Sequence, residues 1–119
     1  MAFRTSREHF ERLVEQAMDA LPDEFTRYFT NIAVVVEEYP TEEDARLTGT
    51  ARRDLLGLFR GAAHQERGGF FDFPLPLPDE IILFRKNIQR ICSSKRELVE
   101  EIRMTLVHEV GHYFGLSEE

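Results

Sequence analysis

The sequence predicts an α+β fold in which a short, mainly three-stranded sheet packs with an N-terminal helix and a long C-terminal helix. Near both ends of the chain, apolar residues recur at three- and four-residue spacing, as in amphipathic helices. Between them lie three short apolar runs rich in branched side chains, separated by turn residues. With 119 residues and 42% hydrophobic composition, the chain suits one domain with its own core, so we assign residues 1–119 to a single domain.

The first helix is expected over residues 6–20. Thr5 and Glu8 have the spacing of a capping box at its start. Pro22 then favours a second, short helix that ends near residues 28–29, because proline suits the first turn of a helix. The apolar residues of the first helix follow at helical spacing: Phe10, Leu13, Val14, Ala17, Met18 and Leu21.

Three strands are expected in the middle of the chain. Ile32–Val36 is a continuous β-branched run, typical of a strand covered on both faces. Leu55–Arg60 is the second strand, and Gly57 within it indicates a bulge or a close backbone approach. Ile81–Arg85 is the third strand. Residues 41–44 could cap a helical turn, but the segment 41–54 is polar and is expected to be mostly loop.

The segment Gly61–Asp79 combines prolines and glycines, which prevent regular structure, with several phenylalanines and leucines. One interpretation is a loop whose aromatic side chains fill the core. The alternative is that some of them line a cleft or a subunit contact.

The last helix is expected to begin at Lys95, after a short helical turn over residues 88–92. Ser94 and Glu97 have the spacing of a capping box. Gly115 stands where a left-handed residue usually ends a helix. An apolar stripe runs along the helix through Leu98, Val99, Ile102, Leu106, Val110 and Phe114.

His108 and His112 stand four residues apart, which places two helical side chains on one face, about 5–6 Å apart at Cβ. They fall off the apolar stripe and therefore face a different surface from the core. Two such imidazoles can share one Zn²⁺ at about 2.0–2.1 Å from a nitrogen of each. Glu109 projects about 100° around the helix from His108, where it can act as general base on a zinc-bound water. We therefore predict one Zn²⁺ per chain.

A third, anionic ligand is available beyond the expected turn at Gly115. That turn would bring Glu118 near the histidines, and Glu118 is the predicted third ligand. Glu119 and the terminal carboxylate are the alternatives, and His64 could approach from its polar loop.

The pattern His108-Glu109-x-x-His112-x-x-Gly115-x-x-Glu118 resembles the zinc-binding signature of the metzincin branch of the zincin metallopeptidases. Metzincins usually offer histidine or aspartate as the third ligand, and they carry a methionine turn that this sequence lacks. The rest of the chain resembles a small bacterial family of minimal zincins in five stretches, namely residues 7–14, 31–37, 55–59, 77–81 and 105–109.

The resemblance implies a small zincin-like domain and a zinc-dependent metallopeptidase, with a peptide or protein as substrate. In zincins the substrate lies extended along an edge strand, which by analogy would be one of the three strands here. The alternative is a catalytically inactive metal-binding or protein-binding module on the same fold. A homodimer or a partner protein that completes the cleft is compatible with either interpretation.

Composition excludes some partners. The formal net charge of −7 argues against nucleic acid, which needs a basic surface. The sequence shows neither a signal peptide nor a membrane span. Cys92 is the single cysteine, so no internal disulfide can form, and a cytoplasmic location is expected. Cys92 itself is expected to be inert.

Overall fold

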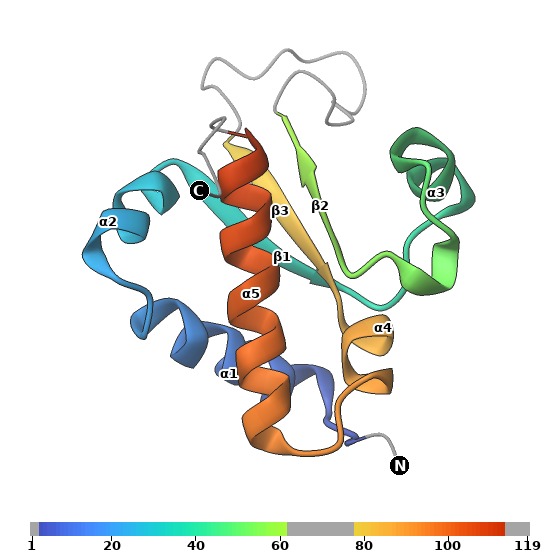
Figure 1. The fold of residues 1–119 in the computed structure, drawn as a ribbon, viewed down its shortest axis with the longest axis horizontal. Coiled ribbons are helices and arrows are strands. Elements are labelled where there is room, and N and C mark those ends of the chain that lie inside the picture. The colour runs from blue at the N-terminus through green and yellow to red at the C-terminus, as the bar shows by residue number, and fades with distance from the viewer. Residues whose placement is uncertain (1–2, 62–77, 114–119) are drawn as a thin grey trace, which may run out of the picture.

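The computed structural model describes residues 3–61 and 78–113, and its sheet is built around the central strand β3 (Asp79–Phe84). β1 (Ile32–Glu37) pairs with one side of β3 in parallel, and β2 (Gly57–Arg60) pairs with the other side antiparallel. The order is therefore β1-β3-β2 (Figure 1). The prediction of an α+β fold with three strands is confirmed.

The expectation that β1 is covered on both faces is met only in part, because its side chains contact an apolar cluster on each face but most of them stay partly exposed. Val36 is its one fully buried residue, and the other five are only partly buried. The reason is the strand order, because β1 forms an edge of the sheet and β3 lies between two neighbours. Ile81–Phe84 of β3 are completely buried instead.

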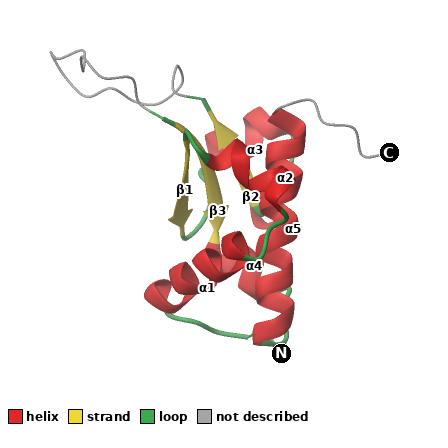
Figure 2. Ribbon diagram, turned by 90° about the vertical axis from the view of Figure 1, so that its left-hand side faces the viewer, coloured by secondary structure: helices red, strands yellow, loops and turns green. Residues whose placement is uncertain are grey.

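The two faces of the sheet contact different apolar clusters. Ile81 and Leu83 point into the main core, whereas Ile82 and Phe84 belong to a smaller cluster on the opposite face. α5 (Lys95–Tyr113) covers the main-core face, and α1 (Arg7–Asp19) lies across its lower part (Figure 2). The buried residues that these helices add to the main core are Phe10, Leu13, Val14, Ala17, Leu98, Ile102, Leu106 and Val110.

The start of α1 differs from the predicted capping box. The Ser6 hydroxyl accepts a hydrogen bond from the His9 amide at 3.0 Å and caps the helix. Thr5 instead donates from its amide and its hydroxyl to Gln89 Oε1, at 3.1 and 3.0 Å. The box is therefore replaced by a tertiary contact to α4 (Arg85–Arg90). The short helix after Pro22 is confirmed as α2 (Asp23–Thr26), followed by a 3-10 turn at Arg27–Phe29.

The prediction of a mostly irregular segment over residues 41–54 is also wrong. Residues Glu42–Thr48 form α3, and a 3-10 turn follows at Arg52–Asp54. Thr41 and Asp44 make a reciprocal capping box with two hydrogen bonds of 3.0 Å. α3 has no apolar stripe, so periodicity could not indicate it, although its cap residues could.

The third strand ends one residue earlier than predicted, because Arg85 begins α4. Arg85 is buried and its Nε donates to Glu38 Oε2 at 2.6 Å. This hydrogen bond lowers the pKa of the Glu38 carboxyl, so both groups keep their charge. The Lys86 amide also donates to the Glu38 carbonyl at 3.1 Å, which fixes the strand-to-helix turn.

Gly57 confirms the predicted close approach. A Cβ placed on it would lie 2.7 Å from Thr105 Cγ2 of α5 and 3.2 Å from the carbonyl oxygen of Ile82. Glycine thus lets β2 lie directly against α5.

We predict that Gly57→Ala destabilises the fold by about 1–3 kcal/mol, because the added methyl group would overlap the helix and the neighbouring strand. Urea denaturation of the metal-free protein measures this change. Gly111→Ala is the matched control, since a Cβ there meets nothing within 4 Å and alanine is the better helix former. Equal unfolding midpoints for the two variants would contradict the close packing of β2 on α5.

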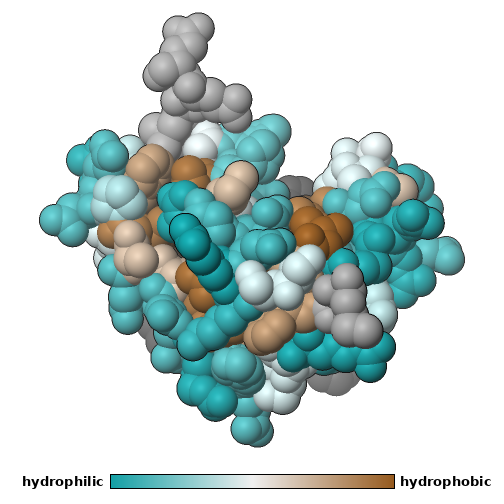
Figure 3. Space-filling model, turned by 60° about the horizontal axis from the view of Figure 1, so that its bottom comes forward, coloured by the Kyte–Doolittle hydropathy of each residue, from teal (hydrophilic) through white to brown (hydrophobic). Residues whose placement is uncertain are grey.

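Exposed apolar side chains are few on the surface of the described residues. The lower face in Figure 3 is mainly hydrophilic, with separate smaller hydrophobic areas. Single exposed apolar residues are normal on a globular protein. No helix within residues 3–61 and 78–113 is long and apolar enough to cross a bilayer. The large exposed apolar side chains are Tyr39, Leu47, Ile91 and Met104.

Candidate functional site

The candidate site lies on the C-terminal part of α5. The Ser94 hydroxyl accepts from the Glu97 amide at 3.1 Å, so the helix begins at Lys95 as predicted. Glu97 accepts from the amide of Ser93 at 3.2 Å, one residue before the donor of a regular capping box. The buried face of α5 consists of Leu98, Ile102, Leu106 and Val110, all fully buried.

His108 and His112 are both exposed, on a face of α5 that the core does not cover. Their ring centroids lie 6.1 Å apart and their planes are 82° from parallel. A zinc ion about 2.0–2.1 Å from one nitrogen of each ring lies about 3 Å from each centroid, so two rings that share it at a tetrahedral angle lie about 5 Å apart. The observed separation fits a shared metal ion with only a small rotation of the side chains.

Glu109 is half-buried and lies between the histidine face and the buried face of α5. Burial raises the pKa of its carboxyl, and the neighbouring imidazoles of His108 and His112 act in the opposite direction. A carboxyl with a raised pKa is a stronger proton acceptor, which suits a general base. The sequence pattern located this residue, but its partial burial follows from the packing of α5 on the sheet.

β2 is the strand next to the histidine face. Thr105 of α5 contacts Gly57 of β2. His108 follows Thr105 by three residues, so it lies on the side of α5 that this contact turns toward β2. Figure 1 shows β2 and α5 running in the same upward direction. The three residue steps of β2 span about 10 Å, close to the length of α5 from Thr105 to His112. The outer strand β2 therefore runs alongside both histidines.

The predicted third ligand lies outside the described residues. This is true of Glu118, of the alternatives Glu119 and His64, and of the helix stop at Gly115. Most of the aromatic segment Gly61–Asp79 also lies outside them. Within residues 3–61 and 78–113, no group of three histidine, cysteine or acidic side chains is placed to hold a metal ion. The structure thus brings together two predicted ligands and the predicted base.

Cys92 is buried against the main core and does not belong to the site. Burial, with smaller contributions from Glu101 and Glu97, raises the pKa of its thiol to about 11. A thiol with so high a pKa is not a nucleophile at neutral pH, in agreement with the sequence interpretation.

Comparisons with known proteins place this geometry in context. The sequence profile of a family described as zincin-like metallopeptidase matches residues 29–119, which include the three described site residues. A conserved hypothetical protein from Thermus thermophilus has a similar structure, with a TM-score of 0.55 and 19% sequence identity. The similarity covers 92% of this chain and 94% of that protein, and at this identity it shows a shared fold. No curated protein matches the chain.

Proposed function

Because the chain belongs to the zincin-like metallopeptidase family, we propose that it hydrolyses peptide bonds with one zinc ion held by His108, His112 and Glu118. The observation that carries the proposal is the pair of exposed imidazoles, 6.1 Å apart on one face of α5. Glu118 supplies the third ligand in this proposal because a carboxylate suits zinc and stands at the motif position.

The residues of the chain have separate roles in the proposed reaction. When bound, zinc would act as a Lewis acid that activates a water molecule and polarises the scissile carbonyl. Glu109 takes a proton from the attacking water and passes it to the nitrogen of the leaving amine. Its partial burial and raised pKa support this role. His108 and His112 bind through neutral imidazole nitrogens.

We place the substrate along the outer edge of β2. β3 is enclosed between its neighbours, so only β1 and β2 have an outer edge within the described sheet. β2 adjoins the histidines, and a groove of about 820 Å³ separates its outer side from α3. An extended peptide can pair with such an edge through main-chain hydrogen bonds. Leu47 of α3, 75% exposed, is available on the opposite wall for an apolar substrate side chain.

A peptide library tests the proposed activity. We expect the zinc-loaded chain to cleave a subset of the peptides, the chelator-treated chain to cleave none, and added zinc to restore cleavage. Mass spectrometry of the products measures the result and identifies the cleaved bonds. If the chain binds zinc but cleaves no peptide, the peptidase proposal is wrong and the metal-binding or protein-binding module is the better description.

A further inference from the structure

Three arginines surround an open hollow of about 680 Å³ that the proposed catalytic site does not use. The hollow lies between the 3-10 turn at Arg52–Asp54 and α4. Figure 1 places α4 beside the lower part of α5, whereas the histidines belong to its upper end. His108 is thirteen residues beyond Lys95, about 20 Å along the helix. The hollow is lined by Tyr39, Ala51, Arg52, Arg53, Asn87 and Arg90.

Hydrogen bonds fix the walls of this hollow. Asn87 is 1% exposed, and its Nδ2 donates to the carbonyls of Arg52 and Leu55, both at 2.8 Å. Arg90 donates to the carbonyl of Arg53, and Arg52 Nε donates to the carbonyl of Pro40 at 2.6 Å. The turn is therefore held on α4, and two of the three guanidinium groups are oriented before any ligand arrives.

The charge of the hollow opposes that of the chain. Three guanidinium groups gather here, although the whole chain carries a net charge of −7. Asp54 is the nearby carboxylate, and its Oδ1 lies 3.9 Å from Arg90 Nη2 and 4.0 Å from Arg53 Nε. Both distances exceed a hydrogen bond, and the Arg53 side chain is 79% exposed. Within the described part of the chain, no hydrogen bond engages the Arg53 guanidinium.

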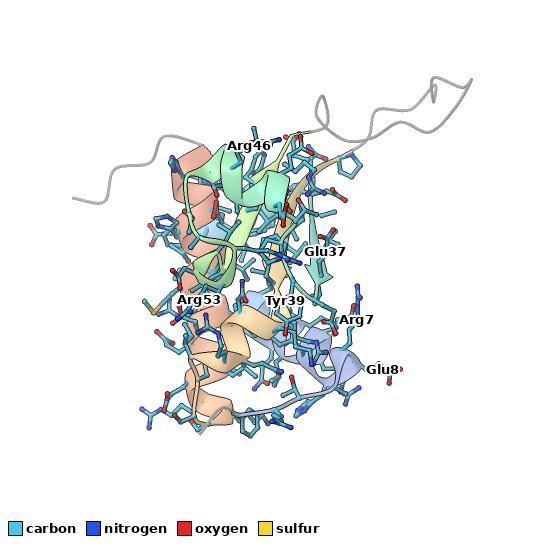
Figure 4. All side chains as sticks on the ribbon, turned by 90° about the vertical axis from the view of Figure 1, so that its right-hand side faces the viewer. Arg7, Glu8, Glu37, Tyr39, Arg46 and Arg53 are labelled. Carbon is cyan, nitrogen blue, oxygen red and sulfur yellow. The ribbon has the colours of Figure 1, made fainter. Side chains whose placement is uncertain are left out.

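Tyr39 adds an aromatic surface to this positive site. It is 54% exposed and shares the hollow with Arg53. Figure 4 shows both residues at the same level of this face, with Arg46 of α3 above them. Guanidinium groups bind phosphate oxygens in a forked geometry, and an aromatic ring can stack on a planar group. The volume also falls in the range of about 300–1,000 Å³ that is usual for small-molecule sites.

We propose that this hollow binds a phosphate monoester that carries an aromatic group, with the phosphate on Arg53 and Arg90 and the aromatic group on Tyr39. A nucleoside monophosphate and a phosphotyrosine residue both have this chemistry. The net charge of −7 on the whole chain repels a long polyanion such as nucleic acid, but a single phosphate group meets mainly the local positive charge of the arginines.

Isothermal titration calorimetry of the full chain tests the proposal with AMP, adenosine, inorganic phosphate and phosphotyrosine. We expect at least one of the two esters to bind at least about tenfold more tightly than adenosine and than inorganic phosphate. Binding of AMP alone identifies the ligand as a nucleotide, and binding of phosphotyrosine alone identifies it as a phosphopeptide. Arg53→Ala should weaken the ester by at least about tenfold, and Tyr39→Ala should weaken the ester but not inorganic phosphate.

Arg46→Ala is the matched control, because Arg46 is an exposed arginine on α3 that does not line the hollow. It should leave the affinity of the ester unchanged. If Arg46→Ala and Arg53→Ala weaken the binding of the ester equally, the weakening reflects only the net charge of the protein, and the proposed site is wrong. Absence of saturable binding by both esters at millimolar concentration would also overturn it, as would amide chemical-shift changes confined to residues around His108.

Discussion

Replacement of Glu109 by glutamine is expected to lower the rate of zinc-dependent peptide cleavage by about 10²–10⁴-fold, without loss of zinc. The amide has the shape of the carboxylate but cannot accept a proton from the attacking water. Glu109 is half-buried beside two exposed imidazoles, so the isosteric change leaves the packing of α5 intact. Cleavage of a library-derived peptide, with zinc content measured on the same sample, gives both quantities.

Glu100→Gln is the matched control for this variant. Glu100 lies on the same helix, is exposed, and forms an ion pair with Arg103 three residues later. Its replacement should leave the cleavage rate unchanged, because exposed ion pairs of this kind contribute little. A Glu109→Gln variant as active as Glu100→Gln would reject Glu109 as the general base.

Replacement of His112 by alanine is expected to weaken zinc binding more than a hundredfold, at least about 2.8 kcal/mol. One of two imidazoles on the same helix face would be lost, and the remaining donors could not complete the site. His9→Ala, which removes a histidine of α1 instead, is the control. Competition titration with a chromophoric zinc chelator measures the affinities. Tight one-to-one zinc binding by a variant that lacks both His108 and His112 would refute the site.

The same titration distinguishes the candidate third ligands. Glu118→Ala should weaken zinc by more than tenfold and Glu119→Ala much less, and the reverse order would overturn the assignment of Glu118. The melting temperature of the metal-free His112→Ala variant should equal that of the unchanged chain, because His112 is exposed and the main core does not include it. A metal-free chain that does not fold would show instead that zinc carries the stability, as in zinc fingers.

The predicted fold is wrong in two situations. In one, the sequence pattern of an element is weak; in the other, a distant residue binds the groups that the pattern assigns to a local hydrogen bond. α3 was missed because it has almost no buried side chain and hence no apolar period. The capping box at Thr5 was wrong because Gln89, 84 residues away, engages both donors of Thr5. The burial of β1 is less complete than expected because a run of branched residues does not show whether a strand is central or at an edge.

The sequence by itself determined the features that depend on neighbours within a few turns of chain. These are the start of α5 at Lys95, its apolar stripe, and the position of His108 and His112 together on the face that the core leaves exposed. All three follow from the helical period and from capping chemistry, which act over three or four residues.

Only the tertiary structure decided what surrounds those residues. The strand order placed β2 beside the histidines, and the close contact at Gly57 fixed that arrangement. The arginine-lined hollow likewise joins a turn at residues 52–54 to Arg90, more than thirty residues later, through buried Asn87. Such arrangements depend on which distant elements pair and pack. Several strand orders are compatible with the same local periodicity, and only the packing of the whole chain selects one of them.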